Sequence, residues 1–238
     1  MPSILITGAN KGLGLGFAQR YAKDGWTVYA SCRNTEKANA LKELKKTFDV
    51  HVHQLDVLSH YEIEEYSKIL ANKPIDILFN NAGIQGPQPQ NFNNTDYELW
   101  TKVFSTNVMS VMKMCETFVS NVEMSKKKLI VNVSSGTSSI SQKTDVTPSF
   151  ASEKGELYLY RSSKTALNMI SRCMAWELRP RGISVVMLGP GWVRTNLGGP
   201  KAKFSIEESI ENCVPMINSW SIKDSGKLLL YDGSEIPW

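Results

Sequence analysis

The chain has 238 residues and a formal net charge of +4 at pH 7, with 42% hydrophobic and 21% charged residues. This length and composition suit one soluble domain with a large core, so we expect a single domain over residues 1–238. The basic residues are scattered apart from the lysine run at 126–128, and long apolar runs are missing, which argues against binding to nucleic acid or membrane.

Apolar runs of strand length alternate with longer amphipathic stretches along the whole chain. This alternation predicts an α/β fold, a single doubly wound Rossmann domain with a mostly parallel seven-stranded sheet. Strands are expected at residues 3–7, 27–32, 50–54, 75–80, 129–133, 183–188 and 227–230. Helices are expected at residues 14–24, 36–48, 59–71, 95–122, 159–179 and 206–219, with two helices or a kink around Thr106 and Asn107.

The first predicted strand, Ser3-Ile-Leu-Ile-Thr7, runs directly into a glycine-rich segment at 8–16 and then into a predicted helix. These are the parts of a site for a nucleotide diphosphate, because glycines let the backbone approach phosphates at the positive end of the helix. The Gly-xxx-Gly-x-Gly spacing differs from the commoner Gly-x-Gly-xx-Gly, and an ordinary loop is the alternative. The position between a strand and a helix favours the phosphate site.

The cysteines and histidines predict neither a disulfide framework nor a metal centre. His51 and His53 share one face of a predicted strand, as a metal-binding pair would, but the sequence offers no evident third ligand. We therefore expect no metal site. Reduced thiols in a cytoplasmic protein are expected for the four widely spaced cysteines, Cys32, Cys115, Cys173 and Cys213.

Tyr160 and Lys164 lie four residues apart in a predicted helix, so their side chains share one face. A phenol has a pKa of about 10, and a lysine ammonium one turn away favours the phenolate. With a hydroxyl from Ser134 or Ser135 beside them, the pair suits proton transfer to and from oxygen. A solvated helix face is the alternative. Tyr158 is a weaker rival to Tyr160, because no lysine follows it after four residues.

In order and spacing, and over essentially the whole chain, these motifs resemble the short-chain dehydrogenase/reductase family. The family's cofactor turn is matched by Thr7-Gly8-xxx-Gly12-x-Gly14, its fourth-strand motif by Asn80-Asn81-Ala82-Gly83, and its nicotinamide-side turn by Pro190-Gly191. The family's catalytic tetrad is matched by Asn107, Ser135, Tyr160 and Lys164.

Within that family, segments 160–168, 191–199 and 233–238 are most similar to the sniffer and C-factor branch of carbonyl reductases. The resemblance implies an NADPH-dependent oxidoreductase that reduces an aldehyde, ketone or quinone to an alcohol by hydride transfer. The cofactor supplies the hydride, and the protein supplies orientation and electrostatics.

The resemblance also implies a role for each member of the tetrad. Tyr160 is the expected general acid, and Ser135, which family placement favours over Ser134, stabilises the developing oxyanion. Lys164 is expected to lower the pKa of Tyr160 and to bind the nicotinamide ribose. Asn107, an unfavourable residue inside a helix, is expected to hold a water that links Lys164 to solvent.

NADP is the expected cofactor. At the end of the second predicted strand an acidic residue binds the 2′-hydroxyl of NAD, whereas an arginine accommodates the 2′-phosphate of NADP. This chain has Cys32 at the family's acidic position, Arg33 next to it and Lys11 within reach, although a solvated charge is the alternative for Arg33. Asp56 resembles the family's adenine contact, and a strand-capping aspartate is the alternative there. The expected cofactor-binding residues are Thr7, Gly8, Asn10, Lys11, Gly12, Leu13, Gly14, Arg33, Asp56, Val57, Asn81, Ala82, Gly83, Tyr160, Lys164, Pro190, Gly191, Val193 and Thr195.

Three predicted loops, at 85–94, 136–155 and 197–205, follow strand ends where ligands bind in open α/β sheets. The stretch between Ser135 and Tyr160 is longer than is common in the family. Its extra residues, which include Asp145, Pro148 and Gly155, are expected to line or partly cover the substrate mouth. Segment 197–200 is predicted to be a hinged lid, and Trp192 beside it is either an apolar wall or an aromatic packed in a loop. We expect no charge in the pocket, and hence neutral carbonyl substrates.

We expect a homodimer, because the predicted helices at 95–122 and 159–179 carry apolar residues on more than one face, including Met109, Met112, Met114, Met169 and Met174. A dinucleotide-binding developmental or signalling protein of C-factor type, with little turnover, is the alternative function. The four intact residues of the matched tetrad argue against it. A structural scaffold is disfavoured by the intact glycine turn.

Overall fold

The computed structural model describes residues 1–143 and 156–238. Seven strands form one sheet in the order β3-β2-β1-β4-β5-β6-β7, and every neighbouring pair is parallel. This confirms the predicted doubly wound α/β fold, with a sheet that is parallel throughout. The strands are β1 (Ser3–Thr7), β2 (Thr27–Cys32), β3 (Val50–Gln54), β4 (Ile77–Asn80), β5 (Leu129–Val133), β6 (Ser184–Gly189) and β7 (Leu228–Leu230).

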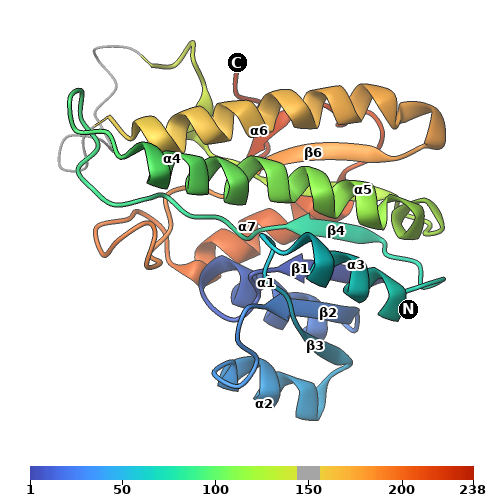
Figure 1. Ribbon diagram of the computed structural model, residues 1–238. Helices are drawn as coiled ribbons and strands as arrows, with labels where there is room; N and C mark the ends of the chain where they lie inside the picture. Colours follow the sequence, from blue (N-terminus) through green and yellow to red (C-terminus); the bar gives the residue numbers. More distant parts are fainter. Residues whose placement is uncertain (144–155) are drawn as a thin grey trace.

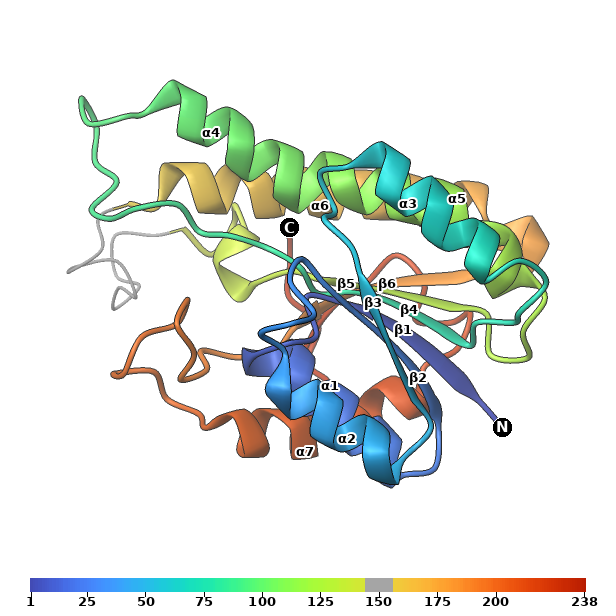
Figure 2. The ribbon, with the colours of Figure 1, turned by 60° about the horizontal axis from the view of Figure 1, so that its bottom comes forward.

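Helices cover both faces of the sheet (Figure 2). One layer contains α1, α2 and α7, and the other contains α3, α5 and α6. Successive residues of β1 show why both layers are apolar: Ile4 and Ile6 pack with the first layer, whereas Leu5 packs with the second. The helices are α1 (Gly12–Lys23), α2 (Asn39–Thr47), α3 (His60–Ile69), α4 (Tyr97–Phe104), α5 (Ser110–Glu123), α6 (Tyr158–Glu177) and α7 (Ile206–Ser219).

Four of the strands, β1, β2, β3 and β5, begin and end where the sequence predicted. β4 and β7 begin later than predicted, by two residues and by one, and β6 is displaced by one residue. In β4 the cause is a backbone hydrogen bond: the amide of Ile75 donates to the carbonyl of Asn121 in α5 rather than to a neighbouring strand. The apolar character of Ile75 reflects burial beneath a helix end rather than membership of the sheet.

The long helical stretch predicted at 95–122 is interrupted, as expected. α4 and α5 are joined by a π-helical turn at Ser105–Met109, in which the amide of Ser110 donates to the carbonyl of Ser105, five residues earlier. Thr106 and Ser110 also donate hydroxyl hydrogen bonds to carbonyls one turn back. Single π turns occur inside α-helices frequently at functional sites, and this one carries Asn107.

The histidine pair lies at the sheet edge on β3. His51 Nε2 is 2.9 Å from a carboxylate oxygen of Asp49, and the His53 ring stacks on Tyr66 with 3.9 Å between centroids. In the two described segments, no three His, Cys, Asp or Glu side chains are grouped to hold a metal ion. None of the helices among these residues is both long and apolar enough to span a membrane.

Candidate active site

A cavity of about 1680 Å³ lies at the carboxyl ends of the strands. The loops that follow β4, β5 and β6 gather there, on the left of Figures 1 and 2. The cavity has two parts. One is walled by the β1–α1 turn and the ends of β2 and β4, and we call it the cofactor half. The other is walled by the loops after β4, β5 and β6, and we call it the substrate half.

The glycines of the β1–α1 turn present backbone to the cofactor half, beside the side chains of Asn10 and Lys11. Gly12 has φ +56°, a left-handed conformation that favours glycine, and begins α1. A Cβ atom at Gly14 would lie 2.3 Å from the carbonyl oxygen of Gly8 and 2.5 Å from Asn81 Nδ2. No side chain caps the start of α1, so its first amides are available to an anion. This cradle fits the diphosphate of a dinucleotide.

Thr7 and Asn81 lock the cradle to the neighbouring strand. Thr7 Oγ1 accepts hydrogen bonds of 3.0 Å from the amides of Asn81 and Ala82. Asn81 Nδ2 donates in return to the carbonyls of Thr7 and Gly8, at 2.9 and 3.2 Å. Thr7 therefore lies behind the cavity wall, whereas Asn81, Ala82 and Gly83 form it.

The end of β2 places cations at the far end of the cofactor half. Arg33 is exposed and lines the cavity, as does Lys11 from the glycine turn, whereas the Cys32 side chain is nearly buried. Asp56 lines the same half, next to Val57. Its carboxylate also accepts a 3.0 Å hydrogen bond from the amide of Leu58. Asp56 therefore caps a turn and also lines the cavity.

Tyr160 and Ser135 meet in the substrate half. Tyr160 comes from the first turn of α6, and Ser135 follows β5. The Ser135 hydroxyl is close enough to the Tyr160 phenol to lower its pKa. Ser135 Oγ lies 2.9 Å from Thr137 Oγ1 and accepts a 3.2 Å hydrogen bond from the Thr137 amide, which fixes its position. Burial raises the pKa of Tyr160 to about 12, because the opposing effect of Ser135 is smaller.

Lys164 lies one turn further along α6, beside Tyr160. Its Nζ is 5.8 Å from the centre of the Tyr160 ring and donates a 2.7 Å hydrogen bond to the carbonyl of Val133. Burial lowers the pKa of Lys164 to about 8. The prediction that Lys164 depresses the Tyr160 pKa was therefore wrong for this structure, because desolvation dominates both groups.

Asn107 acts on the backbone rather than on the cavity. It is fully buried, and its amide nitrogen donates to the Ile84 carbonyl at 2.8 Å and to Ser163 Oγ at 2.9 Å. Its Oδ1 accepts a 2.9 Å hydrogen bond from the Ile84 amide. The π-helical turn thus aims Asn107 at the segment after β4 and at Ser163 in α6, next to Gly83.

The structure distinguishes between the two candidate serines, Ser134 and Ser135, and between the two candidate tyrosines, Tyr158 and Tyr160. Ser134 Oγ donates a 2.6 Å hydrogen bond to Asn168 Oδ1 in the interior, so its hydroxyl is occupied. Tyr158 is 39% exposed at the start of α6. Ser135 and Tyr160 are therefore the members of each pair whose hydroxyl groups meet in the cavity.

Four residues after β6 line the cavity: Pro190, Gly191, Val193 and Thr195. Trp192 also lines it, and its ring nitrogen donates a 2.8 Å hydrogen bond to the Gly198 carbonyl. Both interpretations of Trp192 therefore hold at once. It is a wall of the cavity and an anchor of the loop that follows.

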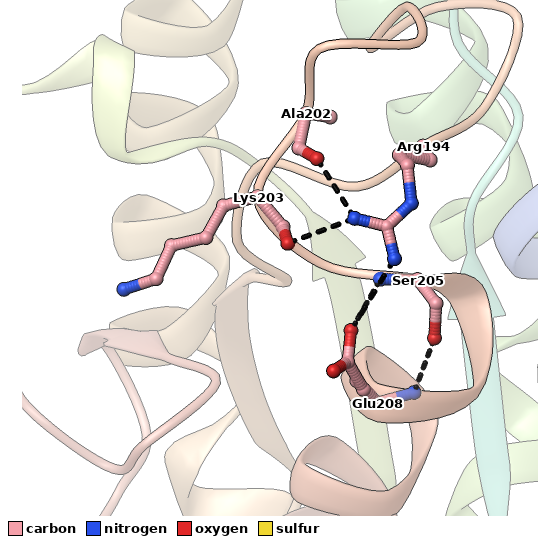
Figure 3. Close-up of polar contacts among 5 residues, drawn as sticks. All are labelled: Arg194, Ala202, Lys203, Ser205 and Glu208. Carbon is pink, nitrogen blue, oxygen red and sulfur yellow. Dashed lines mark hydrogen bonds and ion pairs between the residues drawn. The ribbon is translucent and has the colours of Figure 1, made fainter.

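That loop, residues 194–203, is closed at its base by an arginine that the sequence did not single out (Figure 3). Arg194 Nη1 donates to the carbonyls of Ala202 and Lys203 at 3.0 and 2.9 Å, and Nη2 is 3.6 Å from Glu208. Glu208 also accepts from the Ser205 amide in a capping box at the start of α7. The Ser-x-x-Glu spacing is a readable signal for the box, whereas nothing in the sequence points to Arg194.

Gln90 is a second functional residue that the sequence did not reveal. It is buried in the loop after β4, where its Nε2 donates to the carbonyls of Gln85 and Pro87 at 2.9 Å. Its Oε1 accepts a 2.9 Å hydrogen bond from the amide of Leu159, which neighbours Tyr160. Because α6 has no side-chain cap of its own, Gln90 supplies one from a distant loop.

The C-terminal segment also reaches the cavity. Ile236 lines it beside Gly136, while Ser139 Oγ donates to the Pro237 carbonyl at 2.5 Å and the Ser141 amide donates to the Trp238 carbonyl at 2.8 Å. This segment therefore packs under the loop that carries Ser135. The extra residues predicted to cover the mouth, Asp145, Pro148 and Gly155, lie outside the described residues.

The prediction of an uncharged substrate half was wrong. Charged side chains from four loops and helices line it, because their long stems reach in from elements that the sequence did not place at the mouth. They are Lys102, Lys143, Glu156, Arg161, Arg194 and Lys203.

A doubly wound parallel sheet with a glycine turn at the start of its first helix is the fold of dinucleotide-binding α/β proteins. Comparison with known proteins identifies the family within this class of dinucleotide-binding folds. The sequence model of the short chain dehydrogenase family matches residues 2–205. The chain therefore belongs to the short-chain dehydrogenase/reductase family of oxidoreductases.

Two curated relatives and two solved structures confirm the branch that the motifs indicated. The chain is 37% identical over 237 residues to the short-chain dehydrogenase anuI of Penicillium roqueforti, covering 96% of this chain and 93% of the relative. It is 32% identical over 165 residues to the C-signal of Myxococcus xanthus, covering 69% and 93%. The NADPH-bound carbonyl reductase from chicken fatty liver has a TM-score of 0.89 at 28% identity, over 100% of this chain and 99% of that one. The carbonyl reductase Sniffer of D. melanogaster has the same TM-score and identity, over 100% of both chains.

Proposed function

We propose that the protein is an NADPH-dependent carbonyl reductase that converts an aldehyde, ketone or quinone to an alcohol. When bound, NADPH supplies a hydride to the carbonyl carbon. Tyr160 donates its proton to the carbonyl oxygen, while Ser135 donates a hydrogen bond to the same oxygen as charge develops on it. Lys164 binds the nicotinamide ribose and passes a proton from solvent back to Tyr160, and Asn107 positions the backbone beside it.

One observation carries this proposal: Tyr160, Ser135 and Lys164 line one cavity with the phosphate cradle, and Lys164 lies one helical turn from Tyr160. A phenol whose pKa is about 12 keeps its proton at neutral pH, so Tyr160 holds the proton that carbonyl reduction requires.

The test is NADPH oxidation, followed at 340 nm with a panel of aldehydes, dicarbonyls and quinones. Tyr160→Phe is expected to lower kcat by about 10²-fold to 10⁴-fold, because the proton donor is removed. Tyr158→Phe is the matched control, since it deletes the same atom from an exposed tyrosine of the same helix. Equal rates for the two variants would overturn the assignment of Tyr160.

We also propose that NADPH is preferred over NADH. Arg33 and Lys11 line the far end of the cofactor half, where the 2′-phosphate of NADP would lie, and an arginine fork matches a phosphate. The NADPH-bound chicken carbonyl reductase supports this choice. Arg33→Ser is expected to weaken NADPH binding by about 10-fold to 100-fold and to leave NADH binding nearly unchanged.

Lys37→Ser is the matched control for the cofactor test, because it removes a charge from the same surface without touching the cavity wall. Fluorescence titration with NADPH and NADH measures the effect. If Arg33→Ser and Lys37→Ser shift NADPH affinity equally, the shift reflects overall charge and Arg33 does not bind the phosphate.

A developmental signalling function with little turnover is the second candidate, favoured by the similarity to the C-signal of Myxococcus xanthus. That function needs a bound dinucleotide but not the proton donor. Tight NADPH binding without turnover on the whole carbonyl panel would favour signalling over reduction. Turnover that is lost in Tyr160→Phe would favour reduction.

We further propose that residues 1–238 form one cytoplasmic domain that associates as a homodimer through α6. Of the methionines expected at an interface, Met114 and Met174 are core residues, whereas Met169 is 64% exposed. Trp176, seven residues beyond Met169 on the same helix face, is 81% exposed. Light scattering measures the mass in solution. If the wild type is a dimer, Trp176→Glu is expected to reduce the measured mass to that of the monomer. A wild type that is itself monomeric would overturn the proposed dimer.

A further inference from the structure

The turn that carries Ser135 is fixed within itself. The Ser135 hydroxyl oxygen accepts a hydrogen bond from the Thr137 amide. The Ser135 carbonyl accepts two more from Ser138, at 3.1 Å from the amide and at 2.5 Å from the hydroxyl. These contacts set the Ser135 hydroxyl relative to its own turn, residues 135–138. They do not set that turn relative to Tyr160, which comes from a different element, α6.

Asn168 connects the two elements. It lies in α6, eight residues beyond Tyr160. Its Nδ2 donates a 2.7 Å hydrogen bond to Ser138 Oγ, and its Oδ1 accepts a 2.6 Å hydrogen bond from Ser134 Oγ. One amide side chain therefore holds the residue immediately before Ser135 and also the residue whose hydroxyl donates to the Ser135 carbonyl.

This bridge is shielded from water. The exposed fractions of Ser134, Ser138 and Asn168 are 2%, 3% and 2%. A hydrogen bond in such an interior is stronger than in water, and a buried polar group that loses its partner costs the full desolvation penalty. The three side chains therefore stay paired in the folded protein, and the position of α6 is passed on to the turn.

Thr165 supports the same turn less firmly. Its Oγ1 is 2.8 Å from the Ser138 carbonyl and 3.0 Å from the Arg161 carbonyl of its own helix. A hydroxyl has a single hydrogen to donate, so Thr165 divides it between the turn and the helix. Asn168 has separate donor and acceptor atoms for its two partners and is the stronger link.

We propose that Asn168 is a positioning residue, which holds Ser135 in register with Tyr160 so that both hydroxyl groups meet the same carbonyl oxygen. This rests on the proposed reductase function and adds a residue to the same site. Asn168 is buried and acts through Ser138 and Ser134 rather than by touching the substrate. A shift of about 1 Å in a reacting group can lower a rate by about 10²-fold, and loss of one oxyanion donor costs about 10²-fold to 10³-fold.

The first test is Asn168→Leu, which keeps the size of the side chain and removes both hydrogen bonds. We expect kcat for carbonyl reduction to fall by about 10-fold to 100-fold, whereas NADPH affinity stays at the wild-type value. Asn121→Leu is the matched control. Asn121 is also buried, and its Nδ2 donates to the carbonyls of Leu70 and Lys73 at 2.7 and 2.8 Å, away from the turn.

Ser138→Ala is a milder variant that breaks the same bridge, and it replaces Asn168→Leu in every measurement if that variant does not fold. Its matched control is Ser171→Ala. The Ser171 hydroxyl is equally buried, donates to the Leu167 carbonyl and accepts from Asn132, so it joins α6 to β5 without reaching the turn. Wild-type kcat in both bridge variants, Asn168→Leu and Ser138→Ala, overturns the proposal.

A double-mutant cycle with Ser135→Ala separates positioning from a general effect on the fold. If Asn168 acts through Ser135, Asn168→Leu lowers kcat by less than about 3-fold once the Ser135 hydroxyl is gone. A residue with a merely structural role lowers kcat by the same factor in both backgrounds. Equal factors therefore overturn the proposal.

Amide hydrogen exchange tests the bridge without turnover. In Asn168→Leu, the amides of Thr137 and Ser138, which bond to Ser135, are expected to exchange about 10-fold faster or more relative to those of β5. Asn121→Leu should leave this ratio unchanged. If no carbonyl compound is reduced, the proposed reductase function fails, and exchange alone then decides whether Asn168 holds the turn. An unchanged ratio in Asn168→Leu overturns that role.

Discussion

The two halves of the cavity are built by different means. In the cofactor half, strand ends and a glycine turn bond to one another through backbone groups and the short side chains of Thr7 and Asn81. In the substrate half, loops are held in place by single long side chains such as Gln90 and Arg194. One half is therefore part of the sheet, whereas the other depends on a few hydrogen bonds between distant segments.

This difference determines what each half tolerates. A substitution in the cofactor half meets backbone that cannot move without disturbing the sheet. In the substrate half a substitution releases a loop and leaves the sheet intact. Loops that are held by few contacts belong to the less stable parts of a protein, and ligand-binding segments are commonly drawn from these parts. The first two of the three predictions that follow test this contrast.

The largest effect is expected from Gly14→Ala. Its Cβ would lie 2.3 Å from the Gly8 carbonyl, so the turn must shift and the phosphate cradle is distorted. We expect NADPH affinity to fall by about 100-fold or more and the free energy of unfolding to fall by about 1–3 kcal/mol. Gly25→Ala is the control, because Gly25 has φ +81° but no atom within 4 Å of the added Cβ. Comparable loss of NADPH affinity in both variants would show that the close approach at Gly14 is not the cause.

A smaller effect is expected from Gln90→Ala. The variant leaves the Leu159 amide without its acceptor and frees the loop after β4. We expect a loss of about 1–2 kcal/mol in the free energy of unfolding and up to about 10-fold in kcat, because Tyr160 is less firmly placed. NADPH affinity should remain at the wild-type value. Asn94→Ala, in the same loop, is the control, since its side chain makes only a 3.4 Å exposed hydrogen bond. A fall in NADPH affinity in Gln90→Ala would show that the two halves are not independent.

The third prediction concerns the pH dependence of stability in the cofactor-free protein. The pKa of Lys164 is about 8 in the folded state and 10.5 ordinarily, so between these values the unfolded chain holds a proton that the folded protein lacks. Stability rises with pH where the unfolded state binds more protons, so Lys164 contributes a rise of at most about 1.4 kcal/mol per pH unit in that window.

Urea denaturation of the wild type and of Lys164→Met between pH 7 and pH 10 measures this contribution as a difference. The difference is required because Tyr160, Cys115 and Cys213, whose pKa values burial raises to about 12, oppose the rise at the upper end of the window. Lys223→Met, on the exposed surface, should leave the pH profile unchanged. Parallel profiles for wild type and Lys164→Met would contradict the lowered pKa.

The sequence predicted the cofactor half well, because that half is encoded locally. Four strands were placed without error, and the glycine turn was recognised from its position between a strand and a helix. The spacing of Tyr160 and Lys164 likewise predicted that they would share a helix face. These inferences use periodicity and local conformational preference, which depend on neighbours in the chain.

The substrate half escaped prediction because its contacts join residues that are far apart in the chain. Gln90 bonds to an amide 69 residues away, and nothing around it in the sequence marks it as a helix cap. The pKa of Tyr160 was predicted in the wrong direction, because the lysine was visible in the sequence and the burial was not. Arg161 lies inside the recognised motif, yet only the structure reveals that its Nε is buried without a hydrogen-bond partner among the described residues.

The π-helical turn at Ser105–Met109 also constrains the length of the chain. It adds one residue to a helical path, so α4 and α5 are offset by roughly 100° relative to a continuous α-helix. With this offset Trp100 reaches Ser162 at 3.1 Å while Val111 remains in the core. If the chain were one residue shorter here, either the Trp100–Ser162 contact or the core position of Val111 would be lost. In sequence alignments of the family, a gap inside this turn would therefore signal a different helix pairing rather than a neutral deletion.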